Sequence, residues 1–213
     1  MPAASKLCTK PECVTLRLQA RKILPFLTSL MSLTSLILPL GTPLIPFSLP
    51  DTQGKIHSEK DYADRKVLVI MFICNHCPYV QAVRQRLIDL QASYDPNDVQ
   101  LIGINSNDAK EYPDDSPTEM KKAIREFGIN FPYLIDESQE VAKKYQAQCT
   151  PEIFVFCRGI LAYHGRVDDS WKDQKKVTRQ ELKEAIDALL RGEKPAPEQQ
   201  FSIGCSIKWK TSI

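Results

Sequence analysis

Two cysteines separated by two residues, Cys74 and Cys77, follow directly after a long apolar run, with Asn75 and His76 between them. A cysteine thiolate can attack a disulfide, and a second cysteine nearby can then attack the mixed disulfide and release the product. Thiolates also bind zinc. The pair therefore predicts thiol–disulfide chemistry, and a zinc site or two packed core cysteines are the alternatives.

The segments on either side of the pair predict a strand-to-helix junction. Val67–Ile73 is a continuous apolar run rich in β-branched residues, which is typical of a central strand buried on both faces. Beyond the cysteines, apolar residues recur at helical spacing as far as about Tyr94, and Val99–Asn105 is a second buried strand. We therefore expect Cys74 at the start of a helix within a β-α-β unit.

This position would make Cys74 a better nucleophile. Unpaired backbone N–H groups and the positive end of the helix stabilise a thiolate, and a protonated His76 adds a second positive charge. A free thiol with a pKa of about 8.5 is only a few per cent ionised at pH 7, whereas a pKa of about 7 leaves it half ionised. Cys77, one turn later, is then placed to resolve a mixed disulfide.

A zinc site has less support in the sequence. Structural zinc takes four nitrogen or sulfur ligands, and the sequence has no second C-x-x-C. Cys74, Cys77 and His76 would need a distant fourth ligand such as Cys205. The redox interpretation is favoured, and no metal or other cofactor is expected.

Further strands follow from the sequence pattern. Residues 45–58 predict a β-hairpin around a turn at Asp51–Gly54, and 131–136 a short strand followed by a helix to about Gln146. Residues 152–167 predict an antiparallel hairpin that turns at Arg158-Gly159. Together with the β-α-β unit, these segments predict a mixed central β-sheet flanked by helices, an α/β fold.

Two further helices carry capping signals. Ser116 as N-cap, Glu119 as its capping-box partner and Gly128 as the C-terminal stop delimit one helix. Thr178 and Glu181 form the same capping-box pattern before the last helix. We place the folded domain at residues 40–192 and expect an irregular, Pro-rich tail at 193–213.

The first 39 residues are expected to be a leader: a disordered segment, a product of an upstream start codon, or a targeting peptide. Its apolar part contains Pro25 and several Ser and Thr residues, so it is a poor transmembrane span, and no stable membrane insertion is expected. Seven cysteines at irregular spacing do not fit a secreted disulfide framework. A cytoplasmic location is expected, with an organelle or export as the alternative if the leader is a targeting signal.

The charge distribution gives no sign of nucleic-acid binding. The formal net charge is +2, and the first thirty residues contain five basic residues and one acidic residue. The rest of the chain is therefore close to neutral and has no basic footprint.

Several motifs together resemble a known superfamily. "FICNHCPYV" after a buried strand, with "CTPEIFVF" far downstream, resembles thioredoxin-like proteins. The hairpin pattern F-x-L-x-D-x-x-G-K at residues 47–55 is similar to the redoxin branch, which is related to the AhpC/TSA proteins. A bacterial group with "NHCPYV", "INSND", "FPYLIDESQEVA", "CTPE", "GRVDDS" and "GCSIKW" in this order matches about residues 31–210.

The resemblance implies a thioredoxin-like fold with an N-terminal hairpin and a thiol–disulfide oxidoreductase activity. It implies that Cys74 is the nucleophile and Cys77 the resolving cysteine. Thr150 and Pro151 match the Thr–cis-Pro loop beside the active disulfide, where the flanking backbone pairs with an extended substrate. The implied partners are a protein or small-molecule disulfide and a separate electron donor or acceptor.

Other candidate residues have weaker signals. Cys149 directly precedes the Thr150-Pro151 loop, so it is either a third redox-active or substrate-trapping thiol or a small buried hydrophobic residue. Cys205 is either a resolving cysteine on a mobile tail or a surface thiol. Three polar residues, Asn105, Asn107 and Asp108, end a strand and could line the groove; Asp168 and Asp169 are either a solvated turn or a carboxylate that assists proton transfer.

Two alternative functions remain on the same fold. A peroxiredoxin-like thiol peroxidase would carry P-x-x-x-T-x-x-C, but aligning its cysteine on Cys77 places Cys74 at the Thr and Ile70 at the Pro. A copper- or zinc-binding chaperone would favour C-x-x-x-C, and the spacing here is one residue shorter.

Overall fold

A five-stranded mixed sheet forms the centre of the computed structural model, which describes residues 32–35, 38–197 and 199–211. The strand order is β6-β5-β4-β8-β9. The strands are β4 (Val67–Phe72), β5 (Val99–Asn105), β6 (Tyr133–Ile135), β8 (Glu152–Cys157) and β9 (Ile160–Gly165). β4, β5 and β6 are parallel, whereas β8 is antiparallel to both β4 and β9. The expected α/β fold with a mixed central sheet is confirmed.

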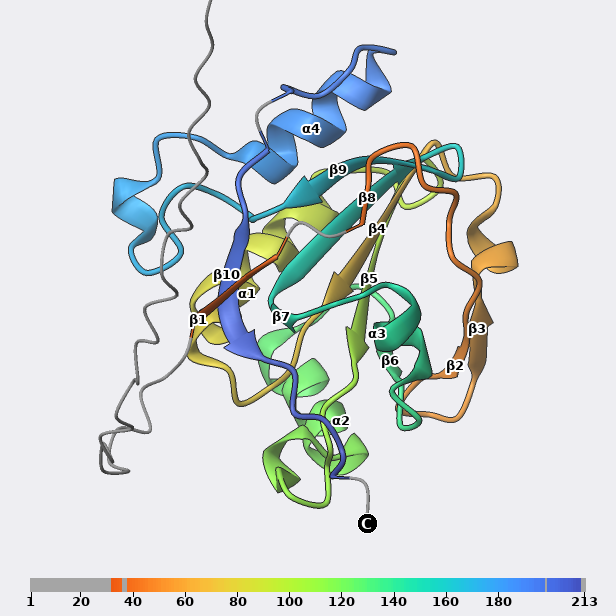
Figure 1. Cartoon of the computed structure of the whole chain (residues 1–213), viewed down its shortest axis with the longest axis vertical. Coiled ribbons are helices and arrows are strands. Elements are labelled where there is room, and N and C mark those ends of the chain that lie inside the picture. The colour runs from red at the N-terminus through yellow and green to blue at the C-terminus, as the bar shows by residue number, and fades with distance from the viewer. Residues whose placement is uncertain (1–31, 36–37, 198, 212–213) are drawn as a thin grey trace, which may run out of the picture.

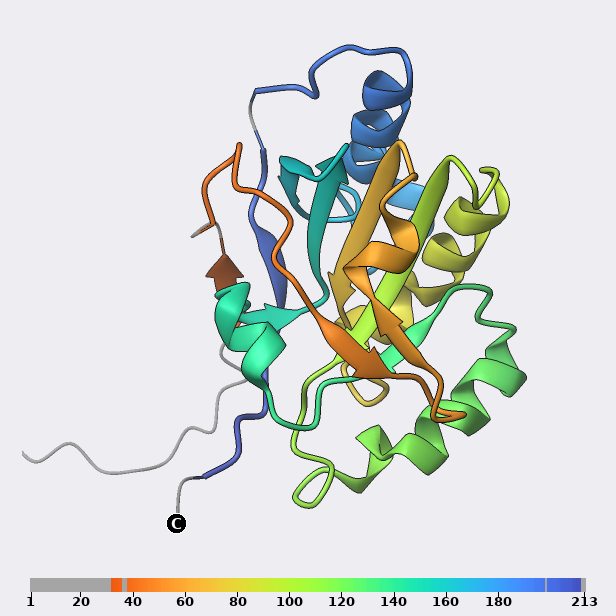
Figure 2. The same ribbon diagram turned by 90° about the vertical axis from the view of Figure 1, so that its right-hand side faces the viewer.

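The side chains of β4 alternate between two apolar clusters, one on each face of the sheet. Val67, Val69 and Met71 pack in the cluster that includes helices α1, α2 and α4. Leu68, Ile70 and Phe72 belong to the opposite cluster, formed with helix α3 and the N-terminal hairpin. The helices are α1 (Pro78–Ala92), α2 (Pro117–Phe127), α3 (Glu140–Lys144) and α4 (Glu181–Leu190). Figures 1 and 2 show these helices on both sides of the sheet.

The predicted N-terminal hairpin is present as β2 (Ser48–Pro50) and β3 (Ile56–Ser58), which are antiparallel. A third sheet has the order β1-β10-β7 and consists of β1 (Ser32–Ser35), β10 (Ser202–Ser206) and β7 (Cys149–Thr150). The tail was expected to be irregular, but β10 lies along the edge of β7 (Figure 1). Most of the expected leader, residues 1–31 and 36–37, lies outside the described residues.

The capping signals had different outcomes in the two helices. Ser116 accepts a hydrogen bond from the backbone of Glu119, and Gly128 ends α2 in a left-handed conformation (φ 67°), as predicted. The reciprocal half of the capping box is wrong, because the Ser116 N–H donates to the Pro113 carbonyl and the Glu119 carboxylate binds Lys122. The N-cap of α4 is instead Gln180, and the Thr178 hydroxyl donates to Asp169. The predicted capping box at the start of α4 is therefore wrong. α3 is also shorter than expected.

No helix within the described part of the chain is both long enough and apolar enough to cross a membrane.

Candidate active site

The connection between β4 and α1 contains both cysteines of the C-x-x-C. Cys77 is the N-cap of α1, with an extended backbone (φ −70°, ψ 120°), and Pro78 is the first helical residue. The expectation that Cys74 begins the helix is therefore wrong. Pro favours the first helical position and disfavours the α conformation in the residue before it, so the helix starts after Cys77.

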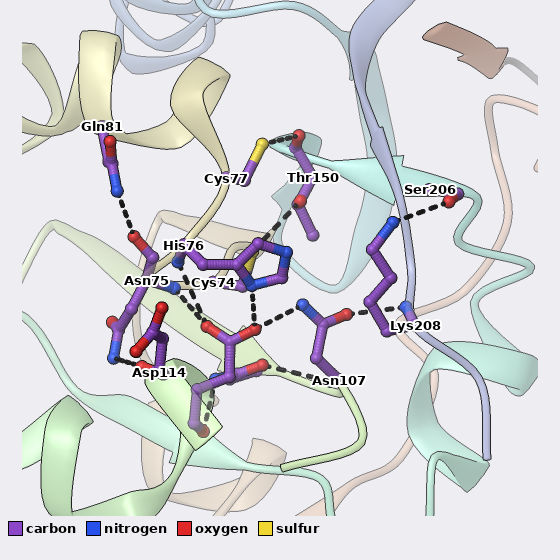
Figure 3. Close-up of polar contacts among 12 residues, drawn as sticks. Cys74, Asn75, His76, Cys77, Gln81, Asn107, Asp114, Thr150, Ser206 and Lys208 are labelled. Carbon is purple, nitrogen blue, oxygen red and sulfur yellow. Dashed lines mark hydrogen bonds and ion pairs between the residues drawn. The ribbon is translucent and has the colours of Figure 1, made fainter. Parts of the chain in front are cut away.

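Both sulfurs contact Thr150, the last residue of β7. Cys74 Sγ lies 3.4 Å from the Thr150 hydroxyl, and Cys77 Sγ donates to the Thr150 carbonyl at 3.1 Å (Figure 3). The Thr150–Pro151 peptide bond is cis. The residues Cys74 and Cys77 are 1% and 0% exposed. The structure thus brings Cys74, Cys77, Thr150 and Pro151 together in one buried cluster.

The two cysteine thiols ionise as a pair. Their mutual hydrogen bond raises the pKa of Cys74 and lowers the pKa of Cys77 against the effect of burial. The Thr150 hydroxyl and the N–H groups of Val80 and Cys205 lower the pKa of Cys77 further. The contact with the Thr150 carbonyl instead favours a protonated Cys77 and a Cys74 thiolate, because the Cys77 sulfur must keep its proton to donate to this carbonyl. One lowered and one raised pKa therefore belong to the pair as a whole. The thiol that keeps its proton stabilises the other as a thiolate.

Asp115 holds the two residues between the cysteines. It lies at the end of a 3-10 helical turn (Pro113–Asp115) and is 2% exposed. One carboxylate oxygen accepts from the backbone N–H groups of Asn75 (2.6 Å) and His76 (3.3 Å). The other contacts His76 Nδ1 at 2.5 Å and accepts from Asn107 Nδ2 at 2.7 Å. The Asp115 carboxylate thus fixes both the backbone and the imidazole. Its partners Asn75, His76 and Asn107 are labelled in Figure 3.

This contact changes the charge of both partners. The hydrogen bond to Asp115 raises the pKa of His76 above its ordinary value, by more than burial lowers it. Burial alone would raise the pKa of Asp115, but the hydrogen bonds from His76 and Asn107 lower it overall. The His76 ring also stacks on Tyr112, with ring centroids 5.4 Å apart. A protonated His76 and an ionised Asp115 therefore form an ion pair beside the thiols.

Comparison with known proteins shows the family of this chain. Residues 40–164, more than half of the chain, match the model of the AhpC/TSA family. The chain belongs to the AhpC/TSA family.

Two solved structures cover most of this AhpC/TSA protein. An uncharacterized conserved protein from Geobacillus kaustophilus is 45% identical, with a TM-score of 0.82, over 87% of this chain and 100% of that one. A hypothetical protein from Sinorhizobium meliloti 1021 is 38% identical, with a TM-score of 0.80, over 84% and 99% of the two chains. Among curated proteins, the thiol-disulfide oxidoreductase ResA of Geobacillus thermodenitrificans is 24% identical over 73% of this chain and 78% of its own.

The remaining cysteines of this AhpC/TSA protein lie in different surroundings. Cys149 is fully buried; its Sγ is 3.8 Å from the Pro151 carbonyl, and burial followed by the charge of Glu152 raises its pKa. Cys205, on β10, is the register partner of Thr150 and is also buried, so the expectation of a surface thiol is wrong. Cys157 ends β8 and is partly exposed. Cys8 and Cys13 lie outside the described residues.

Three potential metal ligands also meet here. One ligand atom each from Cys74, His76 and Asp115 lie within 4.8 Å of one another. Such a set could hold an ion, but in this structure the His76 Nδ1 and Asp115 carboxylate atoms bind each other. It differs from the zinc set considered from the sequence (Cys74, Cys77, His76 and Cys205), because it contains Asp115 and neither Cys77 nor Cys205.

Asp115 is the site residue that the sequence analysis missed. It lies 39 residues from His76 and directly precedes the N-cap of α2, where an acidic residue is an ordinary feature of a helix start. Asn107 gave a weak signal at a strand end, and it hydrogen-bonds to Asp115. Asp168 is buried and paired with Arg86, and Asp169 bonds to Thr178, so both carboxylates have partners of their own at the cleft beside Pro151.

Proposed function

We propose that this AhpC/TSA protein is a thiol–disulfide oxidoreductase that uses Cys74 and Cys77 as its redox pair. The observation that carries the proposal is the pair itself: two buried cysteines in C-x-x-C spacing at a strand-to-helix junction, each with its sulfur in contact with Thr150. The name of the ResA relative agrees with this activity. A protein or small-molecule disulfide is the substrate, and a separate thiol or disulfide partner restores the pair.

The reaction consists of two exchange steps. The Cys74 thiolate attacks one sulfur of the substrate disulfide, forms a mixed disulfide and releases the other substrate sulfur as a thiolate. Cys77, after losing its proton, attacks Cys74 Sγ, forms the Cys74–Cys77 disulfide and releases the second substrate thiolate. The substrate gains two electrons and the pair loses two. The same steps run in reverse when the oxidised pair meets a dithiol.

We assign attack to Cys74 and resolution to Cys77. The carbonyl of Thr150 holds the Cys77 proton, whereas the Thr150 hydroxyl is able to donate to a Cys74 thiolate. A small cleft of about 70 Å³ lies beside Pro151. We place the substrate at this cleft, whose walls are apolar (Val83, Trp171, Ile203) and charged (Arg166, Asp168, Asp169).

Trapping a mixed disulfide tests both the activity and the assignment. Cys77→Ser is expected to accumulate a mixed disulfide on Cys74 when a disulfide substrate is added, because the resolving thiol is gone. Cys74→Ser is expected to lose turnover without accumulating this species. Mass spectrometry of the alkylated protein reads both outcomes. A wild-type protein that forms no Cys74–Cys77 disulfide and reduces no disulfide would refute the activity, and trapping only on Cys77 would reverse the roles.

A further inference from the structure

The C-terminal strand β10 brings a third cysteine to the redox pair. β10 is antiparallel to β7, with Cys205 opposite Thr150 and Ser206 opposite Cys149. Thr150 is the residue that contacts both Cys74 Sγ and Cys77 Sγ. The strand therefore lies against the loop that forms one side of the site.

Gly204 permits this close approach. A Cβ atom at Gly204 would lie 2.0 Å from the Thr150 carbonyl oxygen and 2.6 Å from the carbonyl carbon. Any other residue would force the two backbones apart, so only glycine fits here. The next residue along the strand, Cys205, is held at a fixed place beside the pair.

The contacts of Cys205 point to Cys77. Cys205 packs in the same buried apolar cluster as Cys77. Burial and a hydrogen bond with Cys77 raise the pKa of the Cys205 thiol, and the Cys205 backbone N–H helps to lower the pKa of Cys77. Cys205 is 8% exposed, and Cys74 belongs to the same cluster. Cys77 thus has a thiol neighbour on each side, Cys74 from its own loop and Cys205 from β10.

We propose that Cys205 is a third redox-active thiol of the site, which exchanges with the Cys74–Cys77 disulfide to form a Cys77–Cys205 disulfide. This inference rests on the proposed dithiol function. The Cys205 sulfur, after losing its proton, attacks Cys77 Sγ. The Cys74–Cys77 bond breaks, the Cys77–Cys205 bond forms, and Cys74 leaves as a thiolate that takes up a proton from solvent. No external oxidant is consumed.

The exchange would leave Cys74 free while the protein stays oxidised, and it would attach β10 covalently to the site. In the dithiol form, burial and the hydrogen bond with Cys77 raise the pKa of Cys205 to about 12, so Cys205 keeps its proton. Once Cys77 is in a disulfide, its sulfur is a weaker hydrogen-bond partner for the Cys205 thiol, so this bond no longer holds the Cys205 proton. Cys205 therefore becomes a better nucleophile at the stage when the exchange requires it.

Disulfide mapping tests the proposal on the full chain. The reduced protein is equilibrated in glutathione buffers of increasing oxidised fraction, alkylated, and digested with trypsin without reduction. Cleavage leaves Cys74 and Cys77 together on residues 67–84 and Cys205 on residues 192–208. We expect a cross-link between these two peptides in the wild type at intermediate to oxidising ratios.

The Cys74→Ser variant makes the result unambiguous. Oxidised glutathione is its oxidant, and the Cys77–Cys205 cross-link is expected to become the main disulfide, while Cys77→Ser is expected to lose it. Cys157→Ser, at the far end of β8, is the matched control and should keep the wild-type pattern. Cys77 found only as a glutathione adduct or a free thiol in Cys74→Ser would overturn the proposal.

The wild-type digest keeps the test decisive if Cys74→Ser does not fold: a wild type with no cross-link at any ratio would also overturn it. Failure of the proposed function would give a different result: the wild type would lack the Cys74–Cys77 disulfide. The Cys74→Ser digest would still show whether Cys77 and Cys205 form a disulfide.

Discussion

The imidazole of His76 reaches the buried carboxylate of Asp115 at 2.5 Å, so its positive charge does not act on the thiols alone. Asp115 raises the pKa of Cys74 by its negative charge, after the larger effects of the bond with Cys77 and of burial. The sequence predicted His76 as a stabiliser of the thiolate. In the structure, His76 neutralises a carboxylate that would otherwise disfavour the thiolate.

His76→Asn is therefore expected to make the redox pair more reducing. The substitution leaves the Asp115 charge without its cationic partner, which raises the lower pKa of the thiol pair. A rise of one pKa unit, about 1.4 kcal/mol, corresponds to a reduction potential about 30 mV more negative. Redox titration at pH 8 measures this shift. Adding Asp115→Asn should restore most of the potential, and an unchanged potential in the single variant would contradict the argument.

Asp115→Asn is expected to lower stability more at pH 6 than at pH 9. The pKa of His76 is raised in the folded state, so its contribution is fully present below the unfolded value and is lost as the pH rises through the folded value. At pH 6 the variant should lose about 3 kcal/mol, typical of breaking a buried charged pair. Urea unfolding at both pH values measures the difference.

The exposed neighbour Asp114 supplies the control for this experiment. Asp114→Asn should change stability by no more than about 0.5 kcal/mol at either pH, as surface substitutions do. Equal losses for Asp115→Asn at pH 6 and pH 9 would show that the ion pair contributes little beyond its neutral hydrogen bonds.

The elements of the fold differ in how far the sequence predicts them. The start and end of α2 follow from Ser116 and Gly128, because both act within one helical turn. The capping box before α4 failed, since the hydroxyl of Thr178 bonds to Asp169 in a loop nine residues earlier. Local signals predict an element only where no tertiary partner competes for the same groups.

The residues of the site also differ in whether the sequence predicts them. The C-x-x-C and the Thr150-Pro151 loop are recognisable as short motifs, whereas Asp115 meets His76 only after the chain has folded. The strand β10 is a similar case: its position depends on backbone pairing with β7 and on the absence of a side chain at Gly204. Neither feature has a periodic hydrophobic pattern that would reveal it.

Gly204→Ala is expected to separate β10 from β7. The new methyl group would collide with the backbone of Thr150, and overpacking of this kind costs about 1–3 kcal/mol. The thiols beneath the strand should then react faster with an alkylating reagent, because β10 helps to bury them. Ser206→Ala, which removes an atom on the same strand, is the control and should leave the alkylation rate within about twofold, a change of about 0.4 kcal/mol. An unchanged rate in Gly204→Ala would show that β10 does not shield the pair.

At the scale of the whole molecule, the central sheet separates two apolar clusters that share no side chain. Ile70 of β4 is fully buried in the cluster with α3 and the hairpin, and Ile186 of α4 is fully buried in the other. The redox pair lies in the cluster with α1 and α4. Packing changes in the cluster with α3 and the hairpin should therefore affect stability without acting directly on the site.

Ile70→Val and Ile186→Val are each expected to destabilise the protein by about 1 kcal/mol, and their effects should add in the double variant to within about 0.5 kcal/mol. Chemical denaturation of the wild type, the two single variants and the double variant measures this sum.

Phe72 and Phe154 provide the contrast, because their rings meet edge to face with centroids 5.8 Å apart. Replacing both with Leu should give a coupling of at least about 0.5 kcal/mol. Comparable coupling in the Ile70 and Ile186 pair would mean that strain passes through the sheet from one cluster to the other. The cluster with α3 and the hairpin would then also influence the cysteines, which lie in the other cluster.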